Sequence, residues 1–446
     1  MQIKLSREVK ELIGILNKNN FEAFVVGGCV RDSLLNTEPH DWDICTNATP
    51  DEIMRCFSDY TIFDAGKKHG TISVVKNKSV YEITTYRIDG EYTDNRHPDS
   101  VVFTKNIELD LSRRDFTVNA MAYNEKVGLV DPFNGRADLE NRIIRCVGEP
   151  DKRFNEDALR IIRALRFSST YGFTIEQTTA DSIIGNAELL KNIAVERIAV
   201  ELNRLLCGKN VEAILENFKA VFAVFIPEII PMFDYDQCTE HHNRDLWRHT
   251  IFSVKSIEPD PALRMTMLLH DLGKPLSCTK DENGKSHFKG HPAISERLSV
   301  KILKRLKYPT EFIKKCALLI KFHDVRFIGS KRQVRHLLNR IGEENFILLL
   351  KVQRADIMAQ SMYEREEKLS SVERGKAYFD EIIAENECFS LKDLNINGKD
   401  LIALGIRGRG IGVILNELLR LVINEEIENQ KNKLIEKAFE LKFSVD

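Results

Sequence analysis

Apolar and polar positions along the chain follow two different periods. Over about the first 140 residues, short runs rich in β-branched and aromatic residues alternate with helix-like segments and are bounded by Gly, Asn, Asp and Pro. These runs predict strands over 23–28, 42–46, 71–75, 80–87 and 127–133. Beyond residue 140 the strand pattern stops, and apolar residues recur at helical spacing almost to the end. The pattern predicts an α+β fold: a head with a small mixed sheet and helices, followed by an all-α neck, body and tail.

Breaks in the helical pattern suggest where this second part divides. Polar or proline-rich stretches interrupt it at 225–237, 279–292 and 386–400. A chain of 446 residues has room for about three or four structural units. We therefore expect four domains, with bounds 1–140 (head), 141–215 (neck), 216–390 (body) and 391–446 (tail).

Composition narrows the class of protein. Hydrophobic residues make up 43% of the chain and charged residues 30%, but no run of about 18 apolar residues appears, so no membrane association is expected. The first twenty residues read as an amphipathic helix. Nine cysteines without a CxxC pair suit reduced thiols, which favours a cytoplasmic location. The net charge of −2 gives no global sign of a nucleic-acid partner.

The segment from 21 to 50 carries the first candidate chemistry. Gly27 and Gly28 follow a predicted strand and precede a predicted helix, a place where backbone N–H groups and the helix dipole can meet a phosphate. Asp41 and Asp43 are two positions apart in a predicted strand, so their carboxylates share one side while Trp42 faces the core. Glu82 lies on another predicted strand of the same sheet.

These three acids suggest a metal site. Neighbouring carboxylates repel, and a divalent cation with a preference for oxygen ligands, such as Mg²⁺, relieves that repulsion. Three carboxylates beside a phosphate-binding turn are what two-metal nucleotidyl transfer requires. The alternative is an acidic loop exposed to solvent. With Glu82 as a third acid we predict Asp41 and Asp43 as Mg²⁺ ligands, with all three acids catalytic.

Longer motifs carry a family resemblance. "GGCVRD" and "DWDICTNATP" are followed by "RRDFTVNAMAYN" (113–124), "DPFNGRADLENRIIRCVGEP" (131–150) and "RFNEDALRIIRALRFSSTYGF" (153–173). In order and spacing they resemble class II tRNA nucleotidyltransferases and bacterial poly(A) polymerases, a branch of the polymerase-β superfamily. The resemblance covers about residues 20–210. It implies a polymerase-β-like head, tRNA as partner, and CTP and ATP as substrates; no obligatory protein partner is evident.

The resemblance also implies roles for single residues. Arg114 and Asp115 are expected to contact the sugar and triphosphate of the incoming nucleotide, and Arg31 a phosphate. Gly27, Gly28 and Arg163 complete the expected nucleotide-binding set. Residues 88–101 match a loop that accompanies terminal A addition in this family, which favours addition of the whole CCA end.

The motif "EDALR" suggests how the base is selected. Cytosine and adenine each present an amino donor beside a ring-nitrogen acceptor, so a carboxylate and a guanidinium read both bases and reject uracil and guanine. The resemblance assigns this to Asp157 and Arg160, with Glu156 orienting the arginine. Asn155 is the expected helix N-cap. The alternative is an ordinary surface ion pair between residues three apart.

A second set of residues lies in the body. Histidines and aspartates follow one another in the order H…HD…H…H…D, with "HDLGK" at 270–274. The series resembles the HD superfamily of metal-dependent phosphohydrolases, which implies a divalent metal (Mn²⁺, Ni²⁺, Co²⁺ or Mg²⁺) and a phosphate contact from Lys274. The expected metal ligands are His249, His270, Asp271, His291, His323 and Asp356.

Several functions remain open after these observations. We predict a CCA tRNA nucleotidyltransferase with an additional HD phosphohydrolase activity and a helical tail that binds tRNA, with a glycine turn over 408–412 near the RNA. A poly(A) polymerase or an A-adding enzyme would share the same head. A metal-dependent phosphohydrolase whose head only binds RNA is an alternative of another class, and a non-catalytic RNA-binding module is a third.

Overall fold

A computed structural model describes residues 3–90, 100–241, 244–327 and 329–442 of the chain. The chain forms two compact units, Met1–Pro227 and Glu228–Asp446. The three borders of the expected four-domain division fall inside these units, so that division remains a prediction. Within the described ranges, no helix combines the length and the apolar character needed to cross a lipid bilayer.

The N-terminal unit begins with the amphipathic helix that the sequence predicts. Helix α1 (Arg7–Lys18) starts at Ser6, whose side chain caps the amide of Val9. Four apolar residues of this helix are buried, namely Val9, Leu12, Ile13 and Leu16. This helix therefore covers part of the head core.

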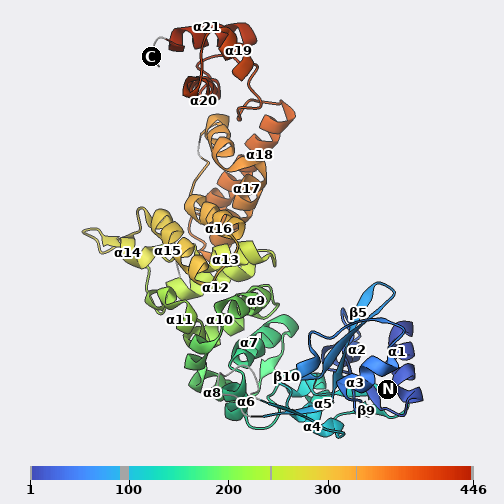
Figure 1. Cartoon of the computed structure of the whole chain (residues 1–446). Helices are drawn as coiled ribbons and strands as arrows, with labels where there is room; N and C mark the ends of the chain where they lie inside the picture. Colours follow the sequence, from blue (N-terminus) through green and yellow to red (C-terminus); the bar gives the residue numbers. More distant parts are fainter. Residues whose placement is uncertain (1–2, 91–99, 242–243, 328, 443–446) are drawn as a thin grey trace. The chain divides into compact units, whose positions relative to one another are not determined.

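A seven-stranded mixed sheet forms the centre of the head (Figure 1). Its order is β3-β4-β5-β2-β1-β8-β9, with β2 and β5 parallel and the other neighbours antiparallel. The strands are β1 (Ala23–Val26), β2 (Ile44–Thr46), β3 (Thr61–Phe63), β4 (Thr71–Lys76), β5 (Ser79–Thr85), β8 (Ala122–Asn124) and β9 (Gly128–Val130). The α+β prediction is confirmed, and β3 and β8 are strands that the apolar pattern missed.

Short helices and one hairpin complete the head. The hairpin pairs β6 (Arg87–Asp89) with β7 (Val101–Phe103). Most of the expected loop over 88–101 lies outside the described residues. The helices are α2 (Gly28–Leu34), α3 (Pro50–Cys56), α4 (Ile107–Ser112) and α5 (Gly135–Glu140). A buried cluster of Phe24, Val26, Cys45, Tyr86, Leu111 and Ala122 joins the sheet to α4.

Helices follow the head within the same unit. They are α6 (Pro150–Glu156), α7 (Leu159–Tyr171), α8 (Gln177–Gly185), α9 (Val195–Leu206), α10 (Val211–Asn217) and α11 (Lys219–Phe225). Helix α7 packs against α9. The expectation that strands end near residue 140 is wrong in detail, because β10 (Ile143–Ile144) pairs with β11 (Thr174–Ile175). Two-residue strands are too short to leave a periodic signal.

The C-terminal unit is mainly helical. Its helices are α12 (Leu246–Ser256), α13 (Pro261–Leu269), α14 (Lys274–Ser277), α15 (His291–Arg305), α16 (Thr310–Phe322), α17 (Lys331–Ala359), α18 (Arg365–Ala384), α19 (Gly398–Ala403), α20 (Arg409–Ile423) and α21 (Lys431–Lys442). One short hairpin joins β12 (Thr279–Lys280) and β13 (Ser286–His287). Gly342, with φ of +75°, interrupts α17.

The last three helices have a small core of their own. Residues from α19, α20 and α21 form a buried cluster with Leu401, Ile414, Leu418, Leu434 and Ala438. The expected tight turn over 408–412 is wrong, because α20 begins at Arg409 and contains Gly410 and Gly412. A run of apolar residues from Ile411 onward continues the helix through these glycines.

Candidate functional site

The acidic residues of the head gather beside the parallel pair of strands. In the β2–β5 register Ile44 is opposite Ile83, so Asp43 and Glu82, each one residue earlier, lie at equivalent positions. Asp41 and Asp43 precede β2 rather than lying within it, although Asp43 still accepts a hydrogen bond from the Val26 amide through its carbonyl oxygen. Trp42 is half-buried and lines a cavity next to the N-terminal segment, so its expected place in the core is wrong.

The charges at this edge act on one another. Partial desolvation raises the pKa of Asp43, the negative charges of Glu82 and Asp41 raise it further, and Arg114 opposes them. All three carboxylates remain exposed. A site in which acids repel one another and stay open to solvent fits a divalent cation with oxygen ligands. The three acids do not, however, form one of the close groups of metal-ligating atoms found among the described residues.

The positively charged side chain of Arg114 lies close to the glycine turn and acts on these acids. Gly27 has φ of +81°, and a Cβ there would lie 2.7 Å from Nη1 of Arg114. Only glycine meets both conditions without strain. The amide of Gly27 donates to the carbonyl oxygen of Met121, so it is already engaged. Gly28 opens α2, and Arg114, close to Gly27 and electrostatically coupled to Asp43, is the basic side chain placed between turn and acids.

Arg31 is more enclosed than a simple phosphate contact requires. It is buried and donates to Asp32 and Asn119. Its guanidinium also stacks on two rings of α7, 5.2 Å from the centre of Phe167 and 4.7 Å from that of Tyr171. Arg31 therefore joins the glycine turn to α7.

The buried Asp115 forms an ion pair with the half-buried Arg163. Arg163 donates to Asp115 Oδ2 through Nε at 3.0 Å and Nη2 at 2.6 Å. Asp115 Oδ1 accepts from Asn119 at 3.0 Å. Burial alone would raise the pKa of Asp115, but Arg163, Asn119 and Arg160 outweigh it and hold the pKa at about 2. The carboxylate is thus permanently charged at neutral pH.

The residues predicted to select the base lie at a break between two helices. The expected helix start at Asn155 is wrong, because α6 ends at Glu156 and α7 begins at Leu159. Asp157 is extended between them, and its Oδ1 accepts from the Leu159 amide at 3.1 Å. This local turn at Asp157, two residues before the start of α7, separates α6 from α7, whose N-cap is Ala158.

Arg160 is held from several sides. Its Nη1 donates to Glu156 at 2.8 Å, and its Nη2 donates to the carbonyl oxygen of Arg113 at 2.9 Å. Glu156 is therefore placed to orient Arg160. Within the described part of the chain the ion pair of Arg160 is with Glu156, and Asp157 instead lies 3.6 Å from Arg197. The surface ion pair considered for Asp157 and Arg160 does not form.

Two polar residues that were not predicted from the sequence connect this site. Asn119 bonds to both Arg31 and Asp115, and Glu201 of α9 approaches Arg163 at 3.7 Å and Arg166 at 2.8 Å. Both are buried. Asn119 lies inside a quoted motif, but Glu201 gave no signal, because a single acid in an amphipathic helix looks like an exposed one.

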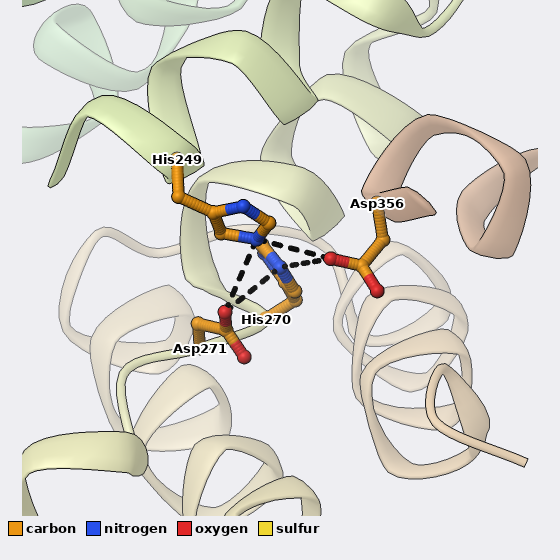
Figure 2. A group of neighbouring side chains, drawn as sticks. All are labelled: His249, His270, Asp271 and Asp356. Atoms are coloured by element: carbon orange, nitrogen blue, oxygen red, sulfur yellow. Dashed lines mark ion pairs between the residues drawn. The ribbon is translucent and has the colours of Figure 1, made fainter. Parts of the chain in front are cut away.

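The C-terminal unit brings the histidine–aspartate series together. Figure 2 shows His249 from α12, His270 and Asp271 from the end of α13, and Asp356 from α17 pointing toward one another. The Nε2 atoms of His249 and His270 lie 3.0 and 3.5 Å from Asp356 Oδ1. All four side chains are buried.

Asp271 belongs to two groups of ligand atoms. Its Oδ2 lies 3.4 Å from His249 and 3.2 Å from His270, and its Oδ1 lies 3.3 Å from His291 and 3.7 Å from His323. The segments that carry Asp271 and His291 approach each other closely at Gly273, where a Cβ would lie 2.5 Å from the carbonyl oxygen of His291. One carboxylate thus offers one oxygen to each group.

The histidine rings are oriented for metal binding. Nδ1 of His270, His291 and His323 lies 2.7–2.8 Å from the carbonyl oxygens of Met267, Phe288 and Ile320, respectively. A carbonyl oxygen only accepts, so Nδ1 carries a proton and Nε2 is the nitrogen that faces the cluster and could bind a metal. The donor set of imidazole nitrogens and carboxylate oxygens fits a divalent transition metal.

Two further polar residues support the cluster. Lys274 donates to Asp271 Oδ2 at 2.7 Å and to Gln237 at 2.9 Å, so the residue expected to bind phosphate lies directly beside the ligands. Gln360 donates to Asp356 Oδ2 at 2.9 Å. Gln360 was not predicted, although its position four residues after Asp356 on a helix placed it on the same face.

Family models match three segments of the chain. Residues 23–145 match "Poly A polymerase head domain", and residues 172–231 match "Probable RNA and SrmB- binding site of polymerase A". Residues 291–438 match "tRNA nucleotidyltransferase domain 2 putative". These matches do not include an HD domain model.

Curated relatives carry the description "CCA-adding enzyme". The protein of Ligilactobacillus salivarius is 34% identical over 449 residues, covering 97% of both chains. That of Geobacillus thermodenitrificans is 50% identical over 197 residues, 44% of this chain. The chain spans about half the length of some of these relatives, 48% for the Geobacillus thermodenitrificans protein.

Solved structures share the fold. The crystal structure of the Bacillus stearothermophilus CCA-adding enzyme in complex with CTP has a TM-score of 0.70 and 27% identity, covering 98% of both chains. The Thermotoga maritima CCA-adding enzyme complexed with tRNA has a TM-score of 0.58 and 21% identity, covering all of both chains.

Proposed function

The chain belongs to the family of CCA-adding enzymes, and on that premise we propose that it adds or repairs the 3′-terminal CCA of tRNA from CTP and ATP. The observation that carries the proposal is a match of 34% identity along 97% of the chain to a CCA-adding enzyme. The placement of Asp43 and Glu82 side by side, next to Gly27 and Arg114, supports it. A divalent metal is a general requirement of such nucleotidyl transfer.

In this proposal the head binds the triphosphate and the acids hold Mg²⁺. When bound between Asp41 and Asp43, Mg²⁺ supplies positive charge to the triphosphate and activates the attacking hydroxyl. Arg114, beside Gly27, adds a positive charge on the phosphate side. The tRNA 3′-hydroxyl attacks the α-phosphate, a new phosphodiester bond forms, and the bond to pyrophosphate breaks as the hydroxyl proton leaves.

Base selection is proposed for Asp157 and Arg160. The carboxylate of Asp157 accepts from the exocyclic amino group of cytosine or adenine, and Arg160 donates to the neighbouring ring nitrogen. The hydrogen bond from Arg160 to Glu156 supports this, since it fixes the direction in which the guanidinium points. Arg163 then acts through Asp115, to which it is bound, and Arg31 through Asn119.

The test is stepwise nucleotide incorporation. A tRNA transcript that lacks its last three nucleotides is incubated with Mg²⁺ and each nucleotide alone or CTP with ATP. We expect two C residues from CTP alone, then one A when ATP is added, and no product with Asp43→Ala. Incorporation of ATP alone, or long homopolymers, would instead identify an A-adding enzyme or a poly(A) polymerase. Equal use of UTP or GTP would contradict base selection by Asp157 and Arg160.

A second activity is favoured by the histidine–aspartate cluster. We propose that it is a metal-dependent phosphohydrolase site whose ligands fall into two groups that share Asp271. A bound divalent metal would lower the pKa of a water molecule. Water then adds to phosphorus, the ester P–O bond breaks, and the alcohol leaves with a proton. In this proposal the ammonium group of Lys274, which lies beside Asp271, offsets the negative charge of the phosphate.

This second activity has its own assay. The full chain is loaded with Mn²⁺, Ni²⁺, Co²⁺ or Mg²⁺ and incubated with 2′,3′-cyclic nucleotides and phosphomonoesters. Release of phosphate or ring opening that disappears in His270→Ala supports the activity. Unchanged substrates with all four metals would contradict it.

A further inference from the structure

A cavity of about 630 Å³ opens beside the histidine–aspartate cluster. This volume lies within the range of small-molecule pockets, about 300–1,000 Å³. One part of its wall consists of Asp271, His291, His323 and Asp356, which belong to the proposed metal site. The wall also carries five basic side chains, against which stand two further acids, Asp324 and Glu364; the basic ones are Lys274, Lys285, Lys289, Arg326 and Lys368. A cavity with so many cations next to metal ligands is suited to an anion larger than one phosphate.

Lys368 is a cation held without a carboxylate at its ammonium group. Its Nζ donates to Gln360 Oε1 at 2.8 Å and to His241 Nδ1 at 3.0 Å. Burial lowers the pKa of His241, as does Lys368 itself, so this imidazole is neutral. In the described part of the chain, the hydrogen bonds of this ammonium therefore go to neutral groups.

Arg326 places a second positive charge close by. Its Nη2 lies 3.1 Å from Asp324, while its Nη1 is buried without a hydrogen-bond partner among the described residues. Burial and the charge of Arg326 lower the pKa of Lys368, and the charges of Glu364, Asp356 and Asp324 offset only part of this effect. Two like charges in a shared cavity repel, and an anion that binds between them removes that cost.

Gln360 links this cationic pair to the proposed metal site. Its Nε2 donates to Asp356 Oδ2 at 2.9 Å, and its Oε1 accepts from Lys368. Each amide end has a defined partner, so Lys368 is fixed two hydrogen bonds away from a metal ligand. This arrangement suits one molecule with two anionic groups, one at the metal ligands and one at Lys368 and Arg326.

The remaining wall contains an aromatic surface. Phe288 is half-buried and lines the cavity. Aromatic side chains stack on nucleobases without a strong preference among them. We infer that the cavity binds a nucleotide with two phosphate groups, with the phosphate to be hydrolysed at the metal ligands and the second phosphate at Lys368 and Arg326. This inference rests on the proposed phosphohydrolase site.

Binding of uncleavable analogues tests the inference without turnover. The probes are adenosine with methylenephosphonate groups at both the 3′ and 5′ positions, and adenosine with this group at the 3′ position only. Isothermal titration calorimetry on the Mn²⁺-loaded full chain compares wild type, Lys368→Met and Lys376→Met. Lys376 is the matched control, since it lies on the same helix, is exposed, and pairs with Asp380 outside the cavity.

The expected result is a selective loss. Lys368→Met raises the Kd of the doubly charged probe about tenfold, the effect of losing one charge-assisted hydrogen bond. It leaves the Kd of the singly substituted probe and the Mn²⁺ affinity unchanged, and Lys376→Met behaves as wild type. Equal weakening of both probes, or of neither, overturns the inference.

Failure of this inference is distinguishable from failure of the phosphohydrolase proposal. Hydrolysis of phosphomonoesters with no dependence on Lys368 retains the activity and overturns the second phosphate site. If no substrate is hydrolysed but the doubly charged probe binds in a Lys368-dependent way, the second phosphate site is retained and the phosphohydrolase proposal fails. The two candidate sources of such a ligand are a free nucleotide and the 3′ end of an RNA. A short oligonucleotide ending in 3′-methylenephosphonate distinguishes between them. Tighter binding than the free nucleotide identifies an RNA end, and equal binding identifies the nucleotide.

Discussion

Replacement of Asp115 by Asn tests how the nucleotide site is held together. The substitution keeps the size of the side chain but removes the charge that holds Arg163 through two hydrogen bonds. The usual pKa of 3.8 falls to about 2 in the folded chain. That difference corresponds to about 2 kcal/mol of folding free energy at neutral pH. Because Asp115 is buried, solvent screening reduces this value little.

The sign of the pH dependence follows from the lowered pKa. Stabilisation by the charged Asp115 is fully present above its unfolded pKa, near 4, and is lost as the pH falls through about 2. We therefore expect Asp115→Asn to lose about 2 kcal/mol at pH 7. At pH 3 the difference between variant and wild type is smaller by about 1 kcal/mol, because the unfolded wild-type chain is already largely protonated there.

Urea unfolding followed by tryptophan fluorescence measures this effect. The chain has two tryptophans, and in a Trp247→Phe background Trp42 reports on the head. Nucleotide incorporation is measured in parallel, and we expect a lower rate, because Arg163 is then held by Glu201 alone on its acidic side. A loss of stability that is equal at pH 7 and pH 3 would refute the assignment of the effect to this charge.

Three further substitutions follow from the described contacts. Gly27→Ala costs about 1–3 kcal/mol of stability and pushes Arg114 from the turn, so the KM for CTP rises; an unchanged KM in steady-state incorporation would contradict this role. Glu156→Gln weakens the hydrogen bond that orients Arg160, so UTP is misincorporated more often relative to CTP in competition assays. Unaltered selectivity would contradict an orienting role of Glu156. Asp271→Asn removes the carboxylate shared by both ligand groups, so atomic absorption finds less bound Mn²⁺ per chain; full metal content would refute a shared ligand.

The sequence predicted the parts of the molecule that leave a periodic or a clustered signal. Long amphipathic helices such as α1 and the strand β1 follow directly from apolar spacing. Neighbouring acids and the histidine–aspartate series were visible because unusual residue types recur in order. The break at Asp157 was not visible, because a side-chain turn inside an otherwise helical pattern changes only local hydrogen bonds.

Contacts between distant segments could not be predicted from the sequence. Asn119 contacts Arg31, 88 positions away, and Glu201 contacts Arg166, 35 positions away, and only the fold decides which buried polar groups meet. An isolated Glu or Gln in a helix is usually exposed, so its type alone favours the wrong environment. The residues that orient a site are therefore harder to predict than those that give the site its chemistry.

Helix α7 is fastened to the glycine turn by Arg31, which stacks on both Phe167 and Tyr171. Asp32 adds a hydrogen bond from the hydroxyl group of Tyr171 at 3.1 Å. A rotation of α7 would therefore displace the turn or separate the two rings from the guanidinium group of Arg31. In the proposed site the turn lies at the triphosphate and the start of α7 lies at the base, so a change of base preference through Asp157 and Arg160 would also have to accommodate Arg31.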